Sequence, residues 1–398
     1  MNKKIPLGAA ISLIAIAVAV TFILTTTFSL NLFNEKVPDV KERTEINQKI
    51  EEIDTYVRSN YNGQIDETKL QDFICAGYIR GLGDKYASYH SAEDSKDISL
   101  SDSGYAVGVG ITISQDESGY IRVVKVDEGT SAFEMGIKAD DFIVAVNGAD
   151  VLTTGYENSV KAVSGDEGTT VKVTVRRDGV DNEYQLVRKK MDIVSVTSEM
   201  LENNVGYIKI TTFNSTTPKQ FKIALEKLIN ANAKQMIFDV RNNGGGFVNS
   251  AADMLNQLLP AGEIATATYK NGDTKIIVKT DGTSTYKLPT VVLVNNKTAS
   301  AAELFAAAMR DFANAQIVGV NTYGKGVMQD VVTLADGSTI SVTTAKYQTT
   351  KTECYDGIGL KPNFEVALSK TEEMDFANLT SLTDPQLKKA IEVAKTMK

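Results

Sequence analysis

The feature that most constrains this chain is a run of residues without charge near its amino terminus. The run extends from Ile5 to Phe33, a length of 29 residues, and directly follows Lys3 and Lys4. A helix rises about 1.5 Å per residue, so roughly 20 of these residues already span the ~30 Å hydrocarbon core of a bilayer. The sequence therefore predicts that residues 1–34 form a short cytoplasmic start and a transmembrane anchor.

The charges that flank this run predict its orientation. Lysines near a membrane span are retained on the cytoplasmic side, so we expect the amino terminus in the cytoplasm and the chain beyond Asn34 outside it. A cleaved signal peptide is the alternative, but its apolar region usually has about 7–15 residues and ends at a small-x-small site. Thr27-Phe28-Ser29 matches such a site poorly. We therefore favour an uncleaved single-pass anchor, and both interpretations place the rest of the chain outside the cytoplasm.

Length and composition describe a folded protein with two or three domains. The chain has 398 residues, and about 150 residues per domain is typical. Hydrophobic residues make up 42% and charged residues 23%, which excludes wholesale disorder. The formal net charge is −8 and no long basic run occurs, so we expect no nucleic-acid partner.

The chain contains a single histidine, His90, and two cysteines, Cys75 and Cys354. One histidine excludes the zinc motifs built on a histidine pair, and it leaves a Ser-His-Asp triad only one candidate base. We find no pattern of metal ligands and expect neither a metal nor another cofactor. We expect any hydrolytic chemistry in this chain to use a base other than His90. Two cysteines are not a disulfide framework, so their pairing is left open.

Residues 35–100 have the pattern of helices. Apolar side chains recur at spacings of 4, 3 and 4 at Ile46, Ile50, Ile53 and Val57. This spacing predicts an amphipathic helix, and a second helix is expected from about residue 67 to residue 79. The apolar faces suit packing or pairing with a second subunit, and we find no chemistry in them.

Residues 101–190 change to short β-like runs, separated by glycine and aspartate turns and interrupted by two short helices. Their order matches that of a bacterial-type PDZ domain. Gly108-Val109-Gly110-Ile111 resembles the carboxylate-binding loop of that domain and the strand that accepts a peptide. In such a loop consecutive N–H groups bind a C-terminal carboxylate, and the strand edge adds the peptide as a further strand. A β-rich spacer without a ligand is the alternative.

Residues 191–370 alternate apolar strands with helices, which predicts an α/β core with a largely parallel sheet. Residues 371–398 are expected to form a C-terminal helical tail. The predicted fold class is therefore mixed α/β and multidomain: a helical start, a PDZ-type β-rich domain and an α/β core.

The first segment of this core that can carry chemistry runs from Asn295 to Glu303 and leads directly from a strand into a helix. Ser300 at this junction would project its hydroxyl from the end of the sheet. The N–H groups of the following helix would point toward any oxyanion formed there. Ser300 and Glu303 also form a capping-box pattern, which needs no catalysis.

The second segment is Gly324-Lys325-Gly326, followed by Gln329. In a phosphate-binding loop the lysine is followed by Ser or Thr, whereas Gly326 follows Lys325 here, and the upstream glycine spacing also differs. In an apolar pocket the ammonium of Lys325 would be desolvated, so its pKa would fall and the neutral amine could act as general base. Gln329 is expected on the same strand face, where an uncharged partner can hold the amine without restoring its charge. A solvated lysine is the alternative.

The third segment is the turn Asn243-Gly244-Gly245-Gly246, which follows an apolar strand. Glycines let the backbone approach a ligand closely and can present an N–H to an oxyanion. An ordinary flexible turn is the alternative.

Together these segments resemble the carboxyl-terminal processing peptidases, a serine-lysine family also called tail-specific proteases. The resemblance is carried, in order, by GLGDKYASYHSAED, DVRNNGGG, NNKTASAAELFAAAM, VNTYGKGVMQ and GIGLKPNFEV. It covers roughly residues 45–395 and implies a core with the ClpP/crotonase-like fold of these proteases. It also implies that Ser300 is the nucleophile, Lys325 the general base and Gln329 the residue that orients this base.

The same resemblance implies that the oxyanion is bound by the N–H of Ala301 and that of Gly245 or Gly246. The implied reaction is endoproteolytic cleavage near the C terminus of a protein, through an acyl-enzyme on Ser300. Its substrates would be proteins with apolar C-terminal tails. The PDZ domain would bind the tail and gate the protease site.

Some features of the family are altered or left open in this chain. Thr298 replaces a family serine and Gly244 a family proline, and neither supplies a reacting group. Ser164 stands where the family often has arginine, which puts the coupling between peptide binding and activation in doubt. The family commonly dimerises through its helical ends, which suits residues 40–80 and 384–397. The alternative function is an inactive PDZ scaffold that only holds C-terminal peptides.

Overall fold

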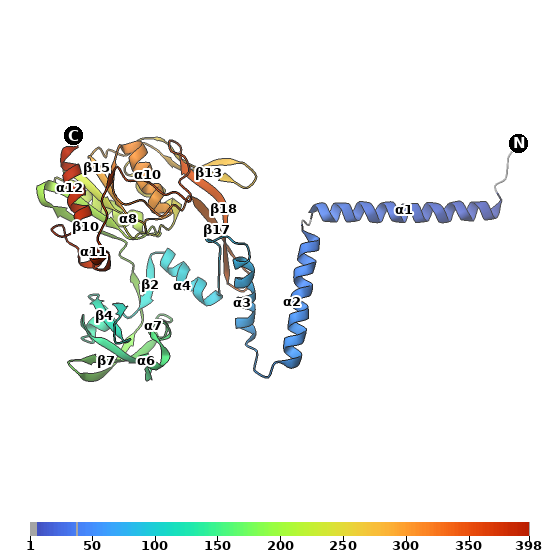
Figure 1. The fold of residues 1–398 in the computed structure, drawn as a ribbon, viewed down its shortest axis with the longest axis horizontal. Helices are drawn as coiled ribbons and strands as arrows, with labels where there is room; N and C mark the ends of the chain where they lie inside the picture. Colours follow the sequence, from blue (N-terminus) through green and yellow to red (C-terminus); the bar gives the residue numbers. More distant parts are fainter. Residues whose placement is uncertain (1–5, 37–38, 398) are drawn as a thin grey trace. The chain divides into compact units, whose positions relative to one another are not determined.

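The computed structural model describes residues 6–36 and 39–397. The chain divides into two compact units, Met1–Gln71 and Asp72–Lys398, which are described separately below. The predicted fold class is confirmed, because helices at the start are followed by a β-rich module and an α/β core (Figure 1).

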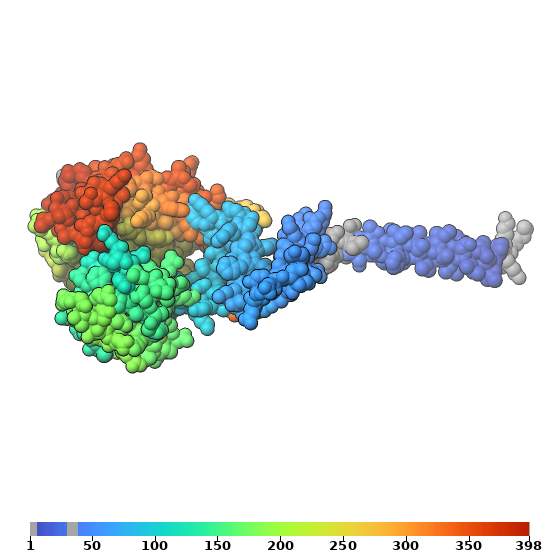
Figure 2. All heavy atoms as spheres, turned by 60° about the horizontal axis from the view of Figure 1, so that its bottom comes forward, coloured from blue at the N-terminus to red at the C-terminus, as the bar shows by residue number. Residues whose placement is uncertain are grey.

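The first unit contains two long helices, α1 (Leu7–Lys36) and α2 (Val40–Asn60). Within α1 the segment Leu7–Ser29 has a mean hydropathy of 2.7, is long and apolar enough to cross a membrane, and is 0% buried. Figure 2 shows residues 7–29 of this helix uncovered by other residues of its unit. Lys3 and Lys4, on which the predicted orientation depends, lie outside the described residues.

The apolar face predicted for α2 lies at the surface. Ile46, Ile50 and Ile53 are 43%, 38% and 56% exposed. The guanidinium of Arg58 near the end of α2 donates to the carboxylate of Glu67 at 2.7 and 2.9 Å. This ion pair bridges the turn between α2 and the next helix. It does not cover the apolar face of α2, whose isoleucines stay exposed.

The second unit begins within α3 (Glu67–Arg80) and continues into β1 (Ser88–His90) and α4 (Ala92–Asp102). Residues 35–100 were expected to be helical, and β1 is the difference. β1 pairs antiparallel with β18 (Thr339–Thr349), so this region contributes a strand to the core.

Residues 105–192 form the β-rich module. β2 (Tyr105–Gly108) pairs with β9 (Lys189–Asp192), and this two-stranded ribbon connects the module to the rest of the unit. The main sheet has the order β3 (Ile111–Gln115), β4 (Ile121–Val126), β5 (Phe142–Val146), β7 (Thr170–Arg177) and β8 (Val180–Val187), with β6 (Ala149–Asp150) beside β5. Three short helices, α5 (Ser131–Glu134), α6 (Val151–Thr154) and α7 (Tyr156–Val163), accompany the sheet. The module has its own hydrophobic core, so it is packed as a domain.

The α/β core is built on a six-stranded sheet. Its strands, in spatial order, are β10 (Val196–Leu201), β11 (Val205–Ile210), β12 (Gln235–Asp239), β15 (Thr290–Val294), β16 (Gln316–Gly319) and β19 (Phe364–Glu365). All neighbouring pairs are parallel except β10 with β11, as predicted for a largely parallel sheet.

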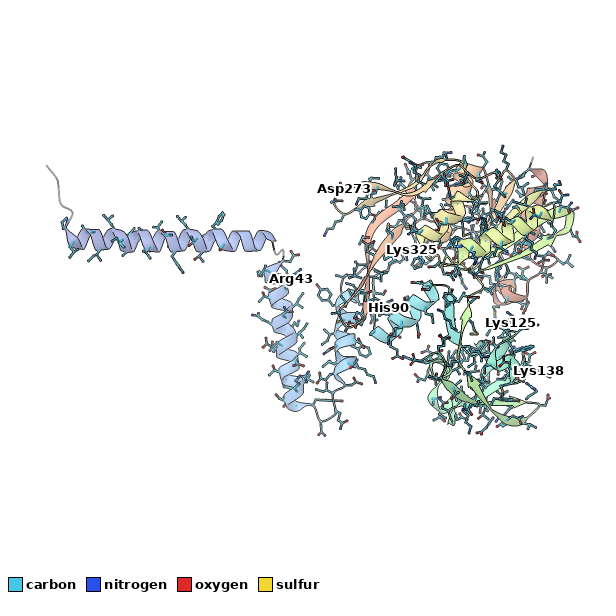
Figure 3. The ribbon with its side chains drawn as sticks, turned by 180° about the vertical axis from the view of Figure 1, so that it is seen from behind. Arg43, His90, Lys125, Lys138, Asp273 and Lys325 are labelled. Atoms are coloured by element: carbon cyan, nitrogen blue, oxygen red, sulfur yellow. The ribbon has the colours of Figure 1, made fainter. Side chains whose placement is uncertain are left out.

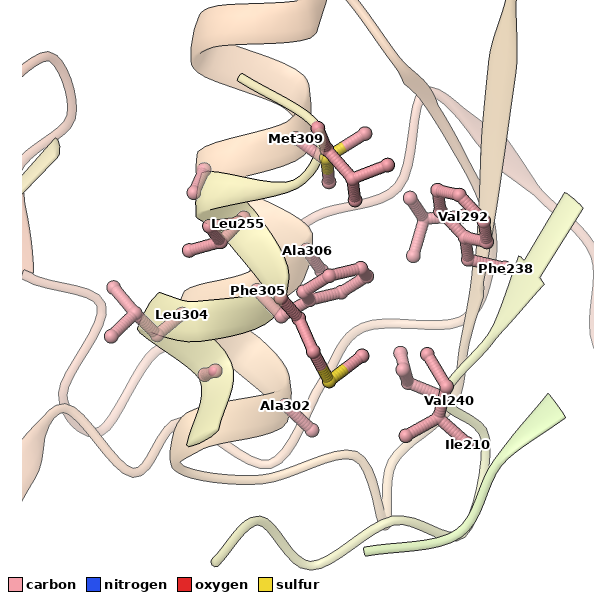
Figure 4. Packing of buried hydrophobic residues seen from close by; sticks show 14 of the residues in the cluster. Ile210, Phe238, Val240, Leu255, Val292, Ala302, Leu304, Phe305, Ala306 and Met309 are labelled. Atoms are coloured by element: carbon pink, nitrogen blue, oxygen red, sulfur yellow. The ribbon is translucent and has the colours of Figure 1, made fainter. Parts of the chain in front are cut away.

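Helices cover both faces of this sheet. α8 (Thr217–Asn230), α9 (Val248–Asn256) and α10 (Ala301–Ala313) share one hydrophobic core with the side chains of one face. Figure 4 shows Phe305 of α10 packed toward Phe238 and Val292 of the sheet. Successive side chains of a strand point to opposite faces, so the intervening apolar residues need a second cover.

That second cover is α12 (Pro385–Thr396), which packs its buried side chains on the other face of the sheet. The apolar face of α12 is buried against this sheet, and the contribution of residues 384–397 to a dimer stays a prediction. The first turn of α12 is held by Arg241, which pairs with Asp384 at 2.8 Å and with Asp239 at the end of β12. The guanidinium and Tyr207 overcome burial and hold the pKa of Asp239 below its usual value.

A second, antiparallel sheet flanks the core. It contains β1, β18, β13 (Gly262–Tyr269) and β14 (Thr274–Thr280), with β17 (Val327–Thr333) paired to β18. β13 pairs antiparallel with both β14 and β18, so the β13–β14 and β17–β18 hairpins together build most of this sheet. The remaining helices are the short segments α11 (Lys370–Met374), η1 (Glu202–Asn204) and η2 (Phe376–Asn378). Cys75 and Cys354 are both free.

Candidate catalytic site

Ser300 occupies the last position before α10, at the turn that leaves β15. Its φ and ψ angles are 56° and −124°, which is a strained conformation for a residue with a side chain. Thr298 stabilises the turn, because its buried hydroxyl donates to the carbonyl of Val240 at 2.8 Å. The turn therefore holds Ser300 at the end of the sheet, and threonine in place of serine at position 298 is accommodated.

Glu303, in the first turn of α10, connects the serine to the lysine loop. Its buried carboxylate accepts hydrogen bonds from the N–H groups of Ser300 (2.9 Å), Gly324 (2.7 Å) and Lys325 (2.8 Å), and from the hydroxyl of Thr322. The contact with Ser300 is the one a capping box predicts. The contacts with residues 322–325 go beyond a cap, because they bring a second loop against the start of the helix.

Lys325 lies in this second loop, just before β17. Gly324 has φ +84°, and a Cβ there would meet the N of Gly359 at 2.8 Å, so the loop passes too close to its neighbour for a side chain. The buried hydroxyl of Tyr347 donates to the carbonyl of Lys325 at 3.0 Å and adds a further anchor. The backbone on both sides of Lys325 is therefore tightly held.

The amine of Lys325 is partly withdrawn from water. Its Nζ lies 4.9 Å from the centre of the Tyr86 ring. Burial lowers the pKa of this lysine, while the negative charges of Asp84 and Glu303 act in the opposite direction. The net shift favours the neutral amine relative to a solvated lysine, as expected for a lysine in an apolar pocket.

Tyr86 and Asp84 were not predicted as site residues. Asp84 accepts the N–H of Tyr86 at 2.9 Å and that of Thr343 on β18 at 3.2 Å, so it fixes this segment to the second sheet. The hydroxyl of Tyr86 is buried without a hydrogen-bond partner in the part of the chain that the structure describes. The only sequence signal was their place in the GLGDKYASYHSAED segment.

Ser300, Lys325 and Gln329 line one cavity of about 510 Å³, together with Gly244, Gly246, Asp102 and apolar residues such as Met328. The amide of Gln329 donates to the hydroxyl of Thr343 at 3.2 Å. Asp102, at the end of α4, was not predicted, and burial raises the pKa of its carboxyl. His90 lies on β1 beside Ser88 and does not line this cavity.

The glycine turn meets Ser300 directly. A Cβ on Gly245 would lie 2.7 Å from Cβ of Ser300, so only glycine allows this approach. The N–H of Gly245 donates to the side chain of Asn243 at 2.8 Å and is therefore occupied. We find no hydrogen bond from the N–H of Gly246 or of Ala301 to any described residue. Of the two glycines considered, Gly246 has the available donor.

The predicted peptide loop lies in the β-rich module, apart from this cavity; Figure 3 labels Lys125 and Lys138 of the module and Lys325 of the core. Gly108 ends β2, and Ile111 begins β3. β3 is an edge strand, since it pairs only with β4 in its sheet. Val109 is buried and its carbonyl accepts the N–H of Ala132. The loop thus leads into an edge to which a peptide strand can be added.

Family models match both regions. The model for peptidase family S41 matches residues 204–366, and the model for the PDZ domain matches residues 107–187. The chain is 36% identical over 328 residues to the carboxy-terminal processing protease CtpA of Bacillus subtilis (strain 168). The aligned residues make up 82% of this chain and 69% of that protein. The chain is 30% identical over 367 residues to a probable CtpA-like serine protease of Staphylococcus aureus (strain N315), with coverage of 91% and 74%.

A solved structure shares the fold. The putative S41 protease from Bacteroides fragilis NCTC 9343 superimposes with a TM-score of 0.52 at 15% identity, over 80% of this chain and 88% of that one. Fold and sequence together define a serine-type peptidase with an embedded PDZ domain. The chain belongs to peptidase family S41. Of the two relatives named above, one is a carboxy-terminal processing protease and the other a probable CtpA-like serine protease.

Proposed function

We propose that this protein is a membrane-anchored, extracytoplasmic endopeptidase that cleaves proteins near their C termini. The observation that carries the proposal is the meeting of Ser300, Lys325 and Gln329 around one cavity, with the serine strained at a strand–helix turn and the lysine partly desolvated. Such a pair supplies a nucleophile and a base without histidine.

In the proposed mechanism, the neutral amine of Lys325 takes the proton of the Ser300 hydroxyl, whose oxygen attacks the scissile carbonyl. The N–H groups of Ala301 and Gly246 stabilise the resulting oxyanion. The ammonium of Lys325 then gives its proton to the departing amine, which leaves an acyl-enzyme on Ser300. The same amine activates the water that releases this acyl group. Gln329 orients the amine, and its present partner, Thr343, keeps the amide at the cavity wall.

The PDZ domain is proposed to bind the apolar tail of the substrate at Gly108–Ile111 and the β3 edge, and to gate the protease. In the position occupied by arginine in many relatives, this chain has Ser164. The last turn of α7 before it is held by Arg188, which donates to the carbonyls of Ala162 and Val163 at 2.9 Å. We propose that gating in this chain depends on contacts other than an arginine at position 164.

The first unit is proposed to anchor the enzyme and to form a homodimer. α1 supplies the span, and the exposed isoleucine face of α2 supplies an apolar contact. Added protease should digest the second unit from outside intact cells and leave the amino terminus protected. Digestion only after lysis would contradict the proposed orientation. Crosslinking should give dimers that disappear when Ile50 and Ile53 are replaced by glutamate.

The test of catalysis uses the full chain in detergent and an unfolded protein with an apolar tail. Ser300→Ala should abolish cleavage because it removes the nucleophile. Lys325→Arg should also abolish cleavage, because an arginine cannot give up its proton. Mass spectrometry of the products would identify the bonds cut. Binding of the tail without any cleavage by the unchanged protein would instead support the inactive scaffold. Unchanged turnover in either variant would remove the assigned role.

A further inference from the structure

A second cavity lies outside the catalytic one. It has a volume of about 650 Å³ and is formed by α4, the β2–β9 ribbon and the β17–β18 hairpin. Its lining includes five serine and threonine residues and two lysines, Lys96 and Lys190. Among the described residues that line it, none carries a carboxylate side chain. Hydroxyls and ammonium groups are hydrogen-bond donors, so this lining suits a negatively charged ligand.

Within the described part of the chain, the two lysines have no acidic partner. Neither Lys96 nor Lys190 forms an ion pair with any residue that the structure describes. Nζ of Lys190 lies 4.0 Å from the centre of the Tyr105 ring, which holds this charge at the cavity. By contrast, the neighbouring Lys189 is paired with Glu134 at 3.3 Å.

The second cavity continues the catalytic one along the hairpin. Val331 and Ser341, which pair across β17 and β18, line the catalytic cavity, and the pair Thr333 and Thr339 lines the second. Residues two apart on a strand share a face, so both cavities open on the same face of the hairpin. From Gln329 to Thr333 the strand rises only about 13 Å, the length of four extended residues.

The second cavity also borders the approach to the PDZ loop. Tyr105 lines it and begins β2, the strand that ends at Gly108. In the antiparallel ribbon Lys190 pairs with Val107. A tail held at the PDZ loop and cleaved at Ser300 would therefore have this cavity beside its middle portion.

We propose that this cavity is a specificity site for acidic residues of the substrate tail, lying between the C-terminal end and the scissile bond. The inference rests on the proposed function and adds the chemical class of substrate. Carboxylates of Asp or Glu in an extended tail would meet Lys96, Lys190 and the surrounding hydroxyls. Because these charges are solvent-exposed, the preference should weaken as salt rises.

The experiment measures kcat/KM of the full-length enzyme in detergent for three protein substrates. They share one apolar C-terminal end and differ only in the middle of the tail, which carries two Glu, two Gln or two Lys residues. We expect the enzyme to prefer the Glu tail over the Gln tail by about two- to thirtyfold, the range for two exposed charge pairs acting together. The double variant Lys96→Glu with Lys190→Glu should reverse the order, so that the Lys tail becomes the best of the three.

The matched control is Lys189→Glu, which changes the same charge on the same ribbon outside the cavity and should keep the preference for the Glu tail. Equal kcat/KM for all three tails, or a double variant that lowers all three alike, would overturn the proposal. Fluorescence anisotropy of the three labelled tails on the Ser300→Ala protein tests the cavity independently of cleavage. If the unchanged protein cleaves none of the tails but binds them in the predicted order, the proposed function fails and the specificity site stands.

Discussion

The replacement Glu303→Gln tests whether the link between the serine and lysine loops controls catalysis. One oxygen of the carboxylate accepts the N–H groups of Ser300 and Lys325, and the other accepts the N–H of Gly324 and the hydroxyl of Thr322. Glutamine keeps the size but replaces one oxygen with an NH₂ group. Whichever oxygen is replaced, two donors lose their acceptor, and one of them belongs to the Gly324-Lys325 loop.

The cost follows from the number of lost acceptors. A buried donor without an acceptor costs about 1–3 kcal/mol, so two cost about 2–6 kcal/mol of unfolding free energy. The loop can reduce this cost by moving away from α10, which displaces the amine from the serine. A misplacement of about 1 Å at a reacting group costs about 100-fold in rate. We therefore expect kcat to fall about 100-fold, together with a lower stability.

The assay compares kcat and urea unfolding of Glu303→Gln with those of a matched control, Glu372→Gln. Glu372 makes the same capping contact in α11, where it accepts the N–H of Ser369 at 2.7 Å, but it is exposed and distant in sequence from the site. The control should lose less than about 1 kcal/mol and keep its kcat. If the two variants behave alike, Glu303 is only a helix cap and the proposed coupling is refuted.

Three further predictions concern the lysine and its loop. The neutral amine of Lys325 is the active form, so kcat/KM should rise with pH through a pKa below the usual lysine value. The replacement Tyr86→Ala admits water to the amine and so raises this pKa. The rising limb of the pH profile should therefore move to higher pH. Asp84→Asn removes a charge that raises the same pKa, so its limb should move to lower pH, and shifts of both variants in one direction would contradict this electrostatic account. Gly324→Ala should abolish cleavage, because the added Cβ would clash with the backbone of Gly359. The control is Gly357→Ala, which also lies at positive φ but has open space around it. This control should lose only about 1–2 kcal/mol of stability and keep its activity.

The local structure around the reacting groups can be predicted from the amino-acid sequence alone. An apolar strand, a short turn with Ser300 and an alanine-rich helix specify a strand–helix junction through hydrophobic periodicity and capping, both of which act over a few residues. The same holds for the 29 uncharged residues at the start and for the PDZ order of strands. These features depend on neighbours in the chain, so they can be predicted without a structure.

The groups that surround the amine of Lys325 depend on tertiary contacts and could not be predicted in this way. Tyr86 precedes Lys325 by more than two hundred positions and reaches it because β1 pairs with β18. Asn243 occupies the N–H of Gly245 and leaves that of Gly246 available, which no glycine pattern reveals. The pKa of a lysine depends on the water and charge within a few ångströms of it, and those neighbours are brought together by long-range strand pairing and packing rather than by sequence spacing.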